Sequence, residues 1–296
     1  MHITRIHRLC LLSLLLLGML CLAACASYEH EPEPEPSPTE PPAEVVLPTD
    51  IDPAIRDFLL TPSAAPTPDT IVIGPDGPII TPGGDGSSDV DFQISCRGYS
   101  FVDIANYFDE IALRTEYGED DYRIHKWTSP IFMYVEGSPT AQDRRVIRTI
   151  IEKMNSVRGF PGIVETKSES EANVVIHFAN NREYDKLTPS NITDKTDGFA
   201  SCWWTDSVMT RAIIGIRTEI SQNERNSVIW EEIVQCTGLQ NDSYQYPDSL
   251  FYQGYNEVQE PTVLDWLMFE ILYHPQMKPG LNREECAIVM LGVLKN

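Results

Sequence analysis

The stretch IWEEIVQCTGLQND, Ile229–Asp242, decides the fold because it reads as a helix with one polar face and an abrupt end. Glu231 and Gln235 are four residues apart, so on a helix they point the same way, and Glu232 lies about 100° round the axis. Gly238 follows at a position where glycine commonly ends a helix by adopting positive φ. The stretch therefore predicts a helix that carries three polar groups and then reverses direction.

Polar capping pairs place the helices along the chain. A Ser, Thr or Asn three residues before an acidic residue satisfies backbone N–H groups in the first helical turn. Four such pairs precede apolar stripes of helical period: Ser100 with Asp103, Thr140 with Asp143, Ser221 with Glu224, and Asn282 with Glu285. The last pair predicts a helix over Cys286–Leu294, and Pro261 starts another whose apolar run is Val263–Tyr273.

Short apolar runs predict strands between these helices. They are Ser129–Gly137, Gly162–Lys167, Ala172–Phe178, and a further strand or hairpin over the SCWW residues 201–204 and Arg211–Ile220. The order is strand, helix, three strands and helix, followed by a mostly helical C-terminal part. This order predicts an α+β fold.

The polar positions of the opening stretch match the spacing of a zinc protease helix, but the residues at the metal-ligand positions are different. In a zincin, two histidines one turn apart bind the metal, and a glutamate between them activates water. In the longer metzincin pattern, a glycine three residues later turns the chain and returns a third histidine. Here Glu231 and Gln235 stand at the first two ligand positions and Glu232 at the position of the base. Asn241 stands at the third ligand position, with Asp242 beside it.

A resemblance to a known family extends along most of the chain. EEIVQCTGLQND is followed by YPDSLF (246–251), LDWLMFEILYHP (264–275) and MKPGL (277–281), and it is preceded by HKWTSPIFMYVEG and ANVVIHF. These segments resemble a family of bacterial lipoproteins known as domain of unknown function 2927, over about residues 98–292. The resemblance implies a metzincin-like small sheet with packed helices, in which EExxQxxG replaces HExxHxxG. The family signature then falls on Glu231, Glu232, Gln235, Gly238, Asp242, Asp248 and Ser249.

Two hypotheses for this site follow from its donor atoms. The favoured one is non-catalytic and needs no cofactor: Asp242 caps, Asp248 and Ser249 tie down the following loop, and Glu232 accepts hydrogen bonds from that loop. The alternative is a metallopeptidase with one divalent metal, centred on Glu232. Because the positions offer only oxygen ligands, calcium or magnesium would suit them better than zinc.

The N-terminal residues predict export and lipid attachment. Residues 1–25 have a short basic start and an apolar run of 14 residues, Leu9–Leu22, the length of a signal-peptide core. The run ends in Leu22-Ala23-Ala24-Cys25, which resembles the lipobox of bacterial lipoproteins. An acylated Cys25 would anchor the chain to the cell membrane or the outer membrane, on the extracytoplasmic side.

The composition divides the remaining chain into a stalk and one domain. Residues 26–95 hold 14 of the 22 prolines and 14 acidic residues against one basic residue, so we expect a disordered stalk. Residues 96–296 are long enough for one domain with a sizeable core. Because stalk and domain are both acidic, nucleic acid is excluded as a partner, which leaves the lipid membrane and an envelope protein or peptide.

Cysteines and aromatic residues give two further expectations. The domain holds Cys96, Cys202, Cys236 and Cys286, and an even count in an exported chain predicts two disulfides, with Cys202–Cys236 as the inner pair. One group of aromatic residues is expected either to line a peptide or glycan groove or to belong to the core: Trp203, Trp204, Tyr244, Tyr246, Phe251, Tyr252 and Tyr255.

Overall fold

The computed structural model describes residues 92–118, 120–192, 196–255 and 257–295. It also describes the backbone of two short antiparallel strands, β1 (Ile73–Gly74) and β2 (Gly77–Pro78). Apart from these two strands, the expected stalk up to residue 91 lies outside the described residues, as do the expected signal peptide and the lipidated Cys25. Within the described part of the chain, no helix is long and apolar enough to cross a membrane.

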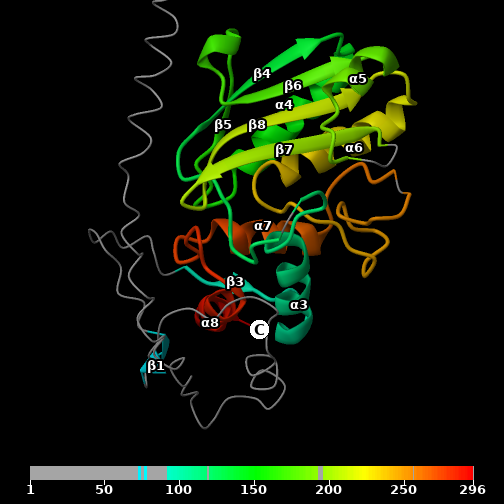
Figure 1. Ribbon diagram of the computed structural model, residues 1–296. Helices are drawn as coiled ribbons and strands as arrows, with labels where there is room; N and C mark the ends of the chain where they lie inside the picture. The colour runs from blue at the N-terminus through cyan, green and yellow to red at the C-terminus, as the bar shows by residue number, and fades with distance from the viewer. Residues whose placement is uncertain are drawn as a thin grey trace, which may run out of the picture. The chain divides into compact units, whose positions relative to one another are not determined.

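The fold is built on a five-stranded mixed sheet with the order β5-β4-β6-β8-β7 (Figure 1). The strands are β4 (Ile131–Gly137), β5 (Ile163–Glu165), β6 (Val174–Ala179), β7 (Gly198–Thr205) and β8 (Val208–Arg217). Four of them run parallel, and β7 pairs antiparallel with β8 at one edge. Helix α4 (Ala141–Asn155) connects β4 to its parallel neighbour β5, as a parallel pair requires. The α+β prediction is confirmed.

The core lies between the sheet and two helices, α4 and α6 (Gln222–Gln235), which share one face of it (Figure 1). Every second residue of β6 points toward them, so Val174 and Ile176 have no exposed surface. They belong to the same buried cluster as Ile150 of α4 and Ile233 of α6. This packing fixes the face of α6 that the sheet covers and leaves its polar positions near the edge strand β7.

The predicted capping pairs at Ser100, Thr140, Ser221 and Asn282 are confirmed, because each capping side chain accepts a hydrogen bond from the backbone N–H of its acidic partner. The helix predicted to start at Pro261 begins at Val263 instead, after the cap Thr262. The helices are α3 (Phe101–Ala112), α4, α6, α7 (Val263–Tyr273) and α8 (Arg283–Val293), and all but α3 have a complete capping box. Asp143 of the α4 box also binds α6, because its fully buried carboxylate accepts hydrogen bonds from Arg225 Nε (2.9 Å) and Gln222 Nε2 (2.7 Å). The starts of α4 and α6 are therefore joined through one buried aspartate.

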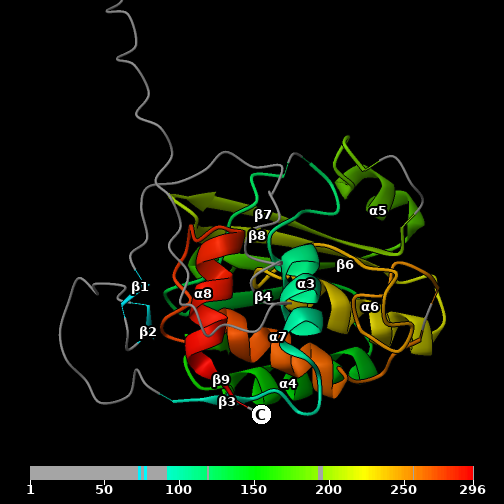
Figure 2. The same cartoon turned by 90° about the horizontal axis from the view of Figure 1, so that it is seen from below.

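Three elements differ from the sequence expectation. Helix α5 (Asn181–Leu187) was not predicted, because only Tyr184 on it is buried and seven residues show no apolar period. Helix α8 begins at Arg283, directly after its cap, rather than at Cys286. Strand β3 (Ile94–Ser95) pairs in parallel with β9 (Leu294–Lys295), so residues assigned to the end of the stalk belong to the fold (Figure 2).

The disulfide prediction is wrong: Cys96, Cys202, Cys236 and Cys286 are all free. Each thiol has its own surroundings, and burial raises the pKa of all four above the ordinary value. The Cys236 Sγ lies 3.1 Å from the carbonyl oxygen of Ile233 within its own helix. Cys202 lies close enough to raise the pKa of the Cys236 thiol, but the two are not joined. An even cysteine count carries no information about bonding geometry.

Candidate functional site

The end of α6 forms a tight polar turn at the predicted position. Gly238 has φ +121°, and a Cβ there would collide with the carbonyl oxygen of His125. The turn brings Asp242 back to the helix, where its Oδ1 accepts a hydrogen bond of 2.8 Å from Gln235 Nε2. Asn241 points elsewhere and donates to the carbonyl oxygen of Glu110 on α3. The residue that returns to the helix is therefore Asp242, one position beyond the third ligand position of the metzincin pattern.

The loop with Asp248 and Ser249 is held by other elements. Ser249 Oγ donates to Asp265 Oδ1 of α7 (2.6 Å) and shares a hydrogen bond with the Tyr107 hydroxyl of α3 (2.6 Å). Asp248 is exposed. No described hydrogen bond joins this loop to the Glu232 side chain, so the expectation that Glu232 accepts from the loop is wrong.

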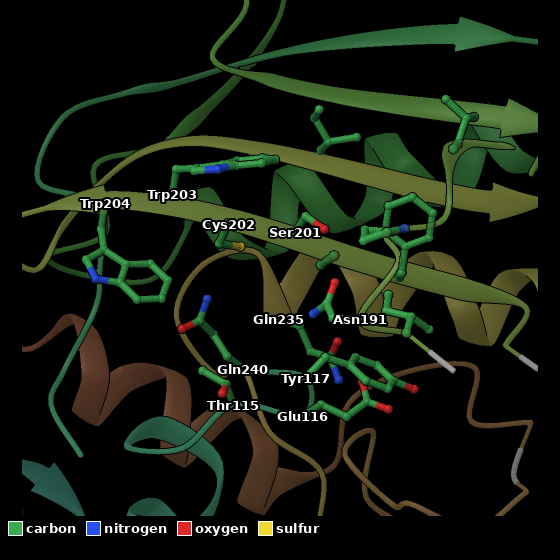
Figure 3. A pocket seen from close by; sticks show the side chains of 16 residues that line it. Thr115, Glu116, Tyr117, Asn191, Ser201, Cys202, Trp203, Trp204, Gln235 and Gln240 are labelled. Atoms are coloured by element: carbon green, nitrogen blue, oxygen red, sulfur yellow. The ribbon is translucent and has the colours of Figure 1, made fainter. Parts of the chain in front are cut away.

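A groove of about 320 Å³ runs along the edge strand β7. All six successive residues from Phe199 to Trp204 line it. Successive side chains of a strand face opposite sides, so a cavity that touches every residue follows the backbone edge rather than one face. Thr115, Glu116 and Tyr117 form the opposite wall, and Gln235 and Gln240 lie between the two walls (Figure 3).

A second cavity of about 310 Å³ adjoins the groove. Glu116 and Tyr117 line both, so this segment separates the two spaces. The described residues that line the second cavity, which we call the acidic pocket, are Glu116, Tyr117, Thr196, Asp197, Glu224, Ser227, Val228, Glu231, Asp242, Tyr252, Gln253, Gly254 and Tyr255. The groove is partly apolar, whereas the acidic pocket is lined by carboxylates and tyrosines.

Carboxyl groups crowd together at the acidic pocket and make one another harder to ionise. Burial raises the pKa of Glu231 well above its usual value, and Asp242 adds to the shift. Burial raises the pKa of Glu232 likewise, and Glu231 adds to it. Burial and the charge of Glu116 raise the pKa of Asp242 to about 8, although the hydrogen bond from Gln235 opposes the rise. Ionising this cluster at neutral pH therefore costs free energy.

Glu232 is the most enclosed member of the cluster. Its side chain is 6% exposed, and its Oε2 has no hydrogen-bond partner. The carboxylate lies against Gly198 at the start of β7, where any Cβ would collide with it. Gly198 stands between Asp197, which lines the acidic pocket, and Phe199, which lines the groove. Glu232 itself is not among the described lining residues of either cavity; it packs against Gly198, between a residue that lines the one and a residue that lines the other.

The residues at the metzincin positions do not fit a transition metal. They present carboxylate and amide oxygens without imidazole or thiolate, which zinc prefers. Among the described residues, no group of three or more His, Cys, Asp or Glu side chains is arranged to hold a metal ion. His125 pairs with Asp121, His177 with Glu136, and His274 with the carbonyl oxygen of Phe92.

The sequence alone missed the wall formed by Glu116 and Tyr117. These residues follow α3 and lie more than 100 positions before α6, in a polar segment with no motif. The aromatic residues are divided between the two alternatives, because some line a cavity and others belong to the core. Trp203 and Trp204 line the groove, and Tyr252 and Tyr255 line the acidic pocket. Phe251 is fully buried in the core, and Tyr246 packs on Tyr107.

Comparison with known proteins identifies the family. No curated protein matches this chain in sequence. The sequence model of the family described as "Protein of unknown function (DUF2927)" matches residues 102–291, which include the sheet, α6 and both cavities. Because the match covers well over half of the chain, the protein belongs to the DUF2927 family.

Proposed function

We propose that this protein is a lipid-anchored envelope lipoprotein whose domain binds an extended polypeptide segment along β7 without cleaving it. The observation that supports this function is the position of the groove along an edge strand. Strand β7 pairs with β8 on one side only, and the groove follows six of its residues. An extended peptide can add to such an edge through backbone hydrogen bonds, while alternate side chains enter pockets. Six residues correspond to roughly 20 Å of strand.

A degenerate metzincin-like site accounts for the lack of hydrolysis in this proposal. The turn at Gly238 has the position of the turn in a metzincin, but the residue that it returns to Gln235 is Asp242, while Asn241 at the third ligand position points away. In this chain the groups brought together are the Asp242 carboxylate and the Gln235 amide, which are hydrogen-bonded to each other. Glu232 is buried and its Oε2 is enclosed without a hydrogen-bond partner, so it does not reach a water molecule in either cavity as a general base must.

Polypeptide binding is tested by mixing the full chain with reduced, iodoacetamide-alkylated ribonuclease, which is unfolded and basic. We expect slower hydrogen exchange of the β7 amides in Phe199–Trp204 and no new peptide termini by mass spectrometry. Trp203, which is 45% exposed, should supply contact area. Trp203→Ala should therefore weaken binding about tenfold, roughly 1.4 kcal/mol.

Phe132 provides the matched control for Trp203. It is 41% exposed and lies on β4, which two strands, β6 and β8, separate from β7 in the sheet order. Phe132→Ala should leave the affinity unchanged. Equal losses in both variants, or the absence of protection on β7, would refute binding at this edge. Cleavage that Glu232→Gln abolishes would establish the metallopeptidase instead.

The proposed anchor is tested by Cys25→Ser. Without the thiol, Cys25 cannot be acylated, and we expect the protein to move from the membrane fraction to the soluble fraction of the envelope. Metabolic labelling with a fatty acid should mark the wild-type protein and leave the variant unlabelled. A variant that stays in the membrane without label would show that the apolar run Leu9–Leu22 is itself the anchor.

A further inference from the structure

The acidic pocket has the chemistry of a cation site. Five carboxylates and three tyrosines line it: Glu116, Asp197, Glu224, Glu231 and Asp242, with Tyr117, Tyr252 and Tyr255. No lysine or arginine is among its described lining residues. Tyrosine rings attract cations through their negative faces, and carboxylates attract them by charge. The walls therefore favour a positively charged occupant that also has an apolar part.

Some of these carboxylates already have partners. Asp197 lies 3.4 Å from the Arg217 guanidinium, and Glu224 accepts from the backbone N–H of Ser221 and from the Tyr255 hydroxyl. Asp242 accepts from Gln235. These three carboxylates belong to the entry to β7, the start of α6 and the loop after α6. Each has its negative charge partly balanced by a hydrogen-bond donor or a guanidinium group.

Two glutamates at the base of the pocket are short of partners. Within the described chain, no hydrogen bond or ion pair is made by the Glu231 side chain, which lines the pocket. Beneath it, Glu232 leaves Oε2 unpartnered and enclosed, with its charge coupled to Glu231, Glu116 and Asp242. A buried acceptor without a donor is rare in native proteins and is costly. A positively charged donor in the pocket would pair with Glu231, and its charge would also act on the enclosed Glu232 beside it.

We propose that the acidic pocket binds an alkylammonium or guanidinium group, as on a lysine or arginine side chain of the bound polypeptide. This inference deepens the proposed function, because the pocket shares Glu116 and Tyr117 with the groove, and Figure 3 shows these two residues on the groove side. A volume of about 310 Å³ accommodates an alkyl chain with its head group and exceeds the need of a bare metal ion. A planar guanidinium matches paired carboxylates through several donors at once.

The cation also changes the protonation of the pocket. Asp242, whose pKa is raised to about 8, holds its proton at neutral pH, and a bound cation favours its charged form and those of Glu231 and Glu232, whose pKa values burial also raises. The other charged or titratable groups that face these three are Glu224 of α6, Glu116 and Tyr117 after α3, Asp197 (paired with Arg217) at the β7 entry, and Tyr252 and Tyr255 of the loop after α6. Binding should therefore release protons and become tighter as pH rises.

The test uses n-butylguanidinium chloride and n-butylammonium chloride with the full chain, by calorimetry in two buffers of different ionisation enthalpy. We expect saturable one-site binding, release of about half a proton or more per cation at pH 7, and affinity at least tenfold higher at pH 8 than at pH 5. 1-Pentanol, which has an alkyl chain and no charge, should not bind.

Variants separate the pocket from the groove. Glu231→Gln combined with Asp242→Asn should weaken cation binding at least tenfold, and Glu231→Gln alone should weaken it by a smaller factor. Asp248→Asn, which removes an exposed charge from the same loop, should change nothing. Trp203→Ala should leave cation binding intact, because a small cation has no backbone to pair with β7.

The outcomes distinguish this inference from the proposed function. Cation binding without polypeptide binding would support the pocket and refute the groove. Polypeptide binding with no saturable cation binding would refute the pocket and leave the groove. Tight binding of Ca²⁺ or Zn²⁺ that butylguanidinium cannot displace would also overturn the inference, since the pocket would then be a metal centre.

Discussion

Replacing Asp143 by alanine is expected to lower the free energy of unfolding by about 3–5 kcal/mol, because it leaves Arg225 buried without its counter-charge. Asp143 has no exposed surface, and Arg225 is 5% exposed. Besides Arg225, the carboxylate accepts from Gln222 Nε2 (2.7 Å) and the Thr140 backbone N–H (2.7 Å). One substitution therefore removes a helix cap and the bond between the starts of α4 and α6.

The control is a second Asp–Arg pair in the same domain. Asp185 lies 3.1 Å from Arg217, but its side chain is 68% exposed, so Asp185→Ala should cost less than about 1 kcal/mol. Urea unfolding measures both variants. A loss below about 1 kcal/mol for Asp143→Ala would contradict the role given to the buried pair.

The acid sensitivity of this pair has a definite sign. Burial alone would raise the pKa of Asp143, but the hydrogen bonds from Gln222, Thr140 and Arg225 overcome it and lower the pKa below its ordinary value. The stability that Asp143 contributes is therefore complete above the unfolded-state pKa near 4 and is lost as pH falls through the lower folded-state value.

Replacing Asp242 by asparagine is expected to have the opposite effect and stabilise the protein at pH 8 by about 2–5 kcal/mol. The folded-state pKa of about 8 lies far above the ordinary 3.8, so folding opposes ionisation. The penalty is absent below about pH 4, grows as pH rises and is complete above about 8. Asparagine removes the charge and keeps an oxygen that can accept from Gln235 Nε2.

The measurement is urea unfolding of wild type and variant at pH 5 and pH 8. Wild type should lose stability between these values, and Asp242→Asn should lose less. Asp248→Asn on the same loop should follow wild type, because Asp248 is exposed. An Asp242→Asn protein that is less stable than wild type at pH 8 would show that this charge is satisfied in the folded state.

A group retained at the expense of stability is commonly a functional one, since binding sites carry unsatisfied charge until the ligand arrives. We expect Asp242→Asn to raise stability, and the same change combined with Glu231→Gln to weaken cation binding. Both effects have one cause, which is the crowding of carboxyl groups at the acidic pocket.

The local features of the fold could be predicted from sequence, and its long-range contacts could not. The capping pairs at Thr140 and Ser221 located their helices because a cap acts within four residues. The turn at Gly238 was visible for the same reason. The approach of Glu116 to Asp242 depends on how α3 packs against the loop after α6, and no local pattern encodes it. Helix α5 escaped notice because burial of Tyr184, rather than periodicity, holds it.

The close contact between Gly198 and Glu232 restricts the order in which substitutions at these two positions can be accepted during evolution. A side chain at position 198 would occupy the space that the Glu232 carboxylate and Val228 now fill. Room must therefore be made at positions 232 and 228 before any residue larger than glycine can be accepted at 198. Because of this contact, we expect homologous sequences that carry glutamate at 232 to keep glycine at 198, at the start of β7.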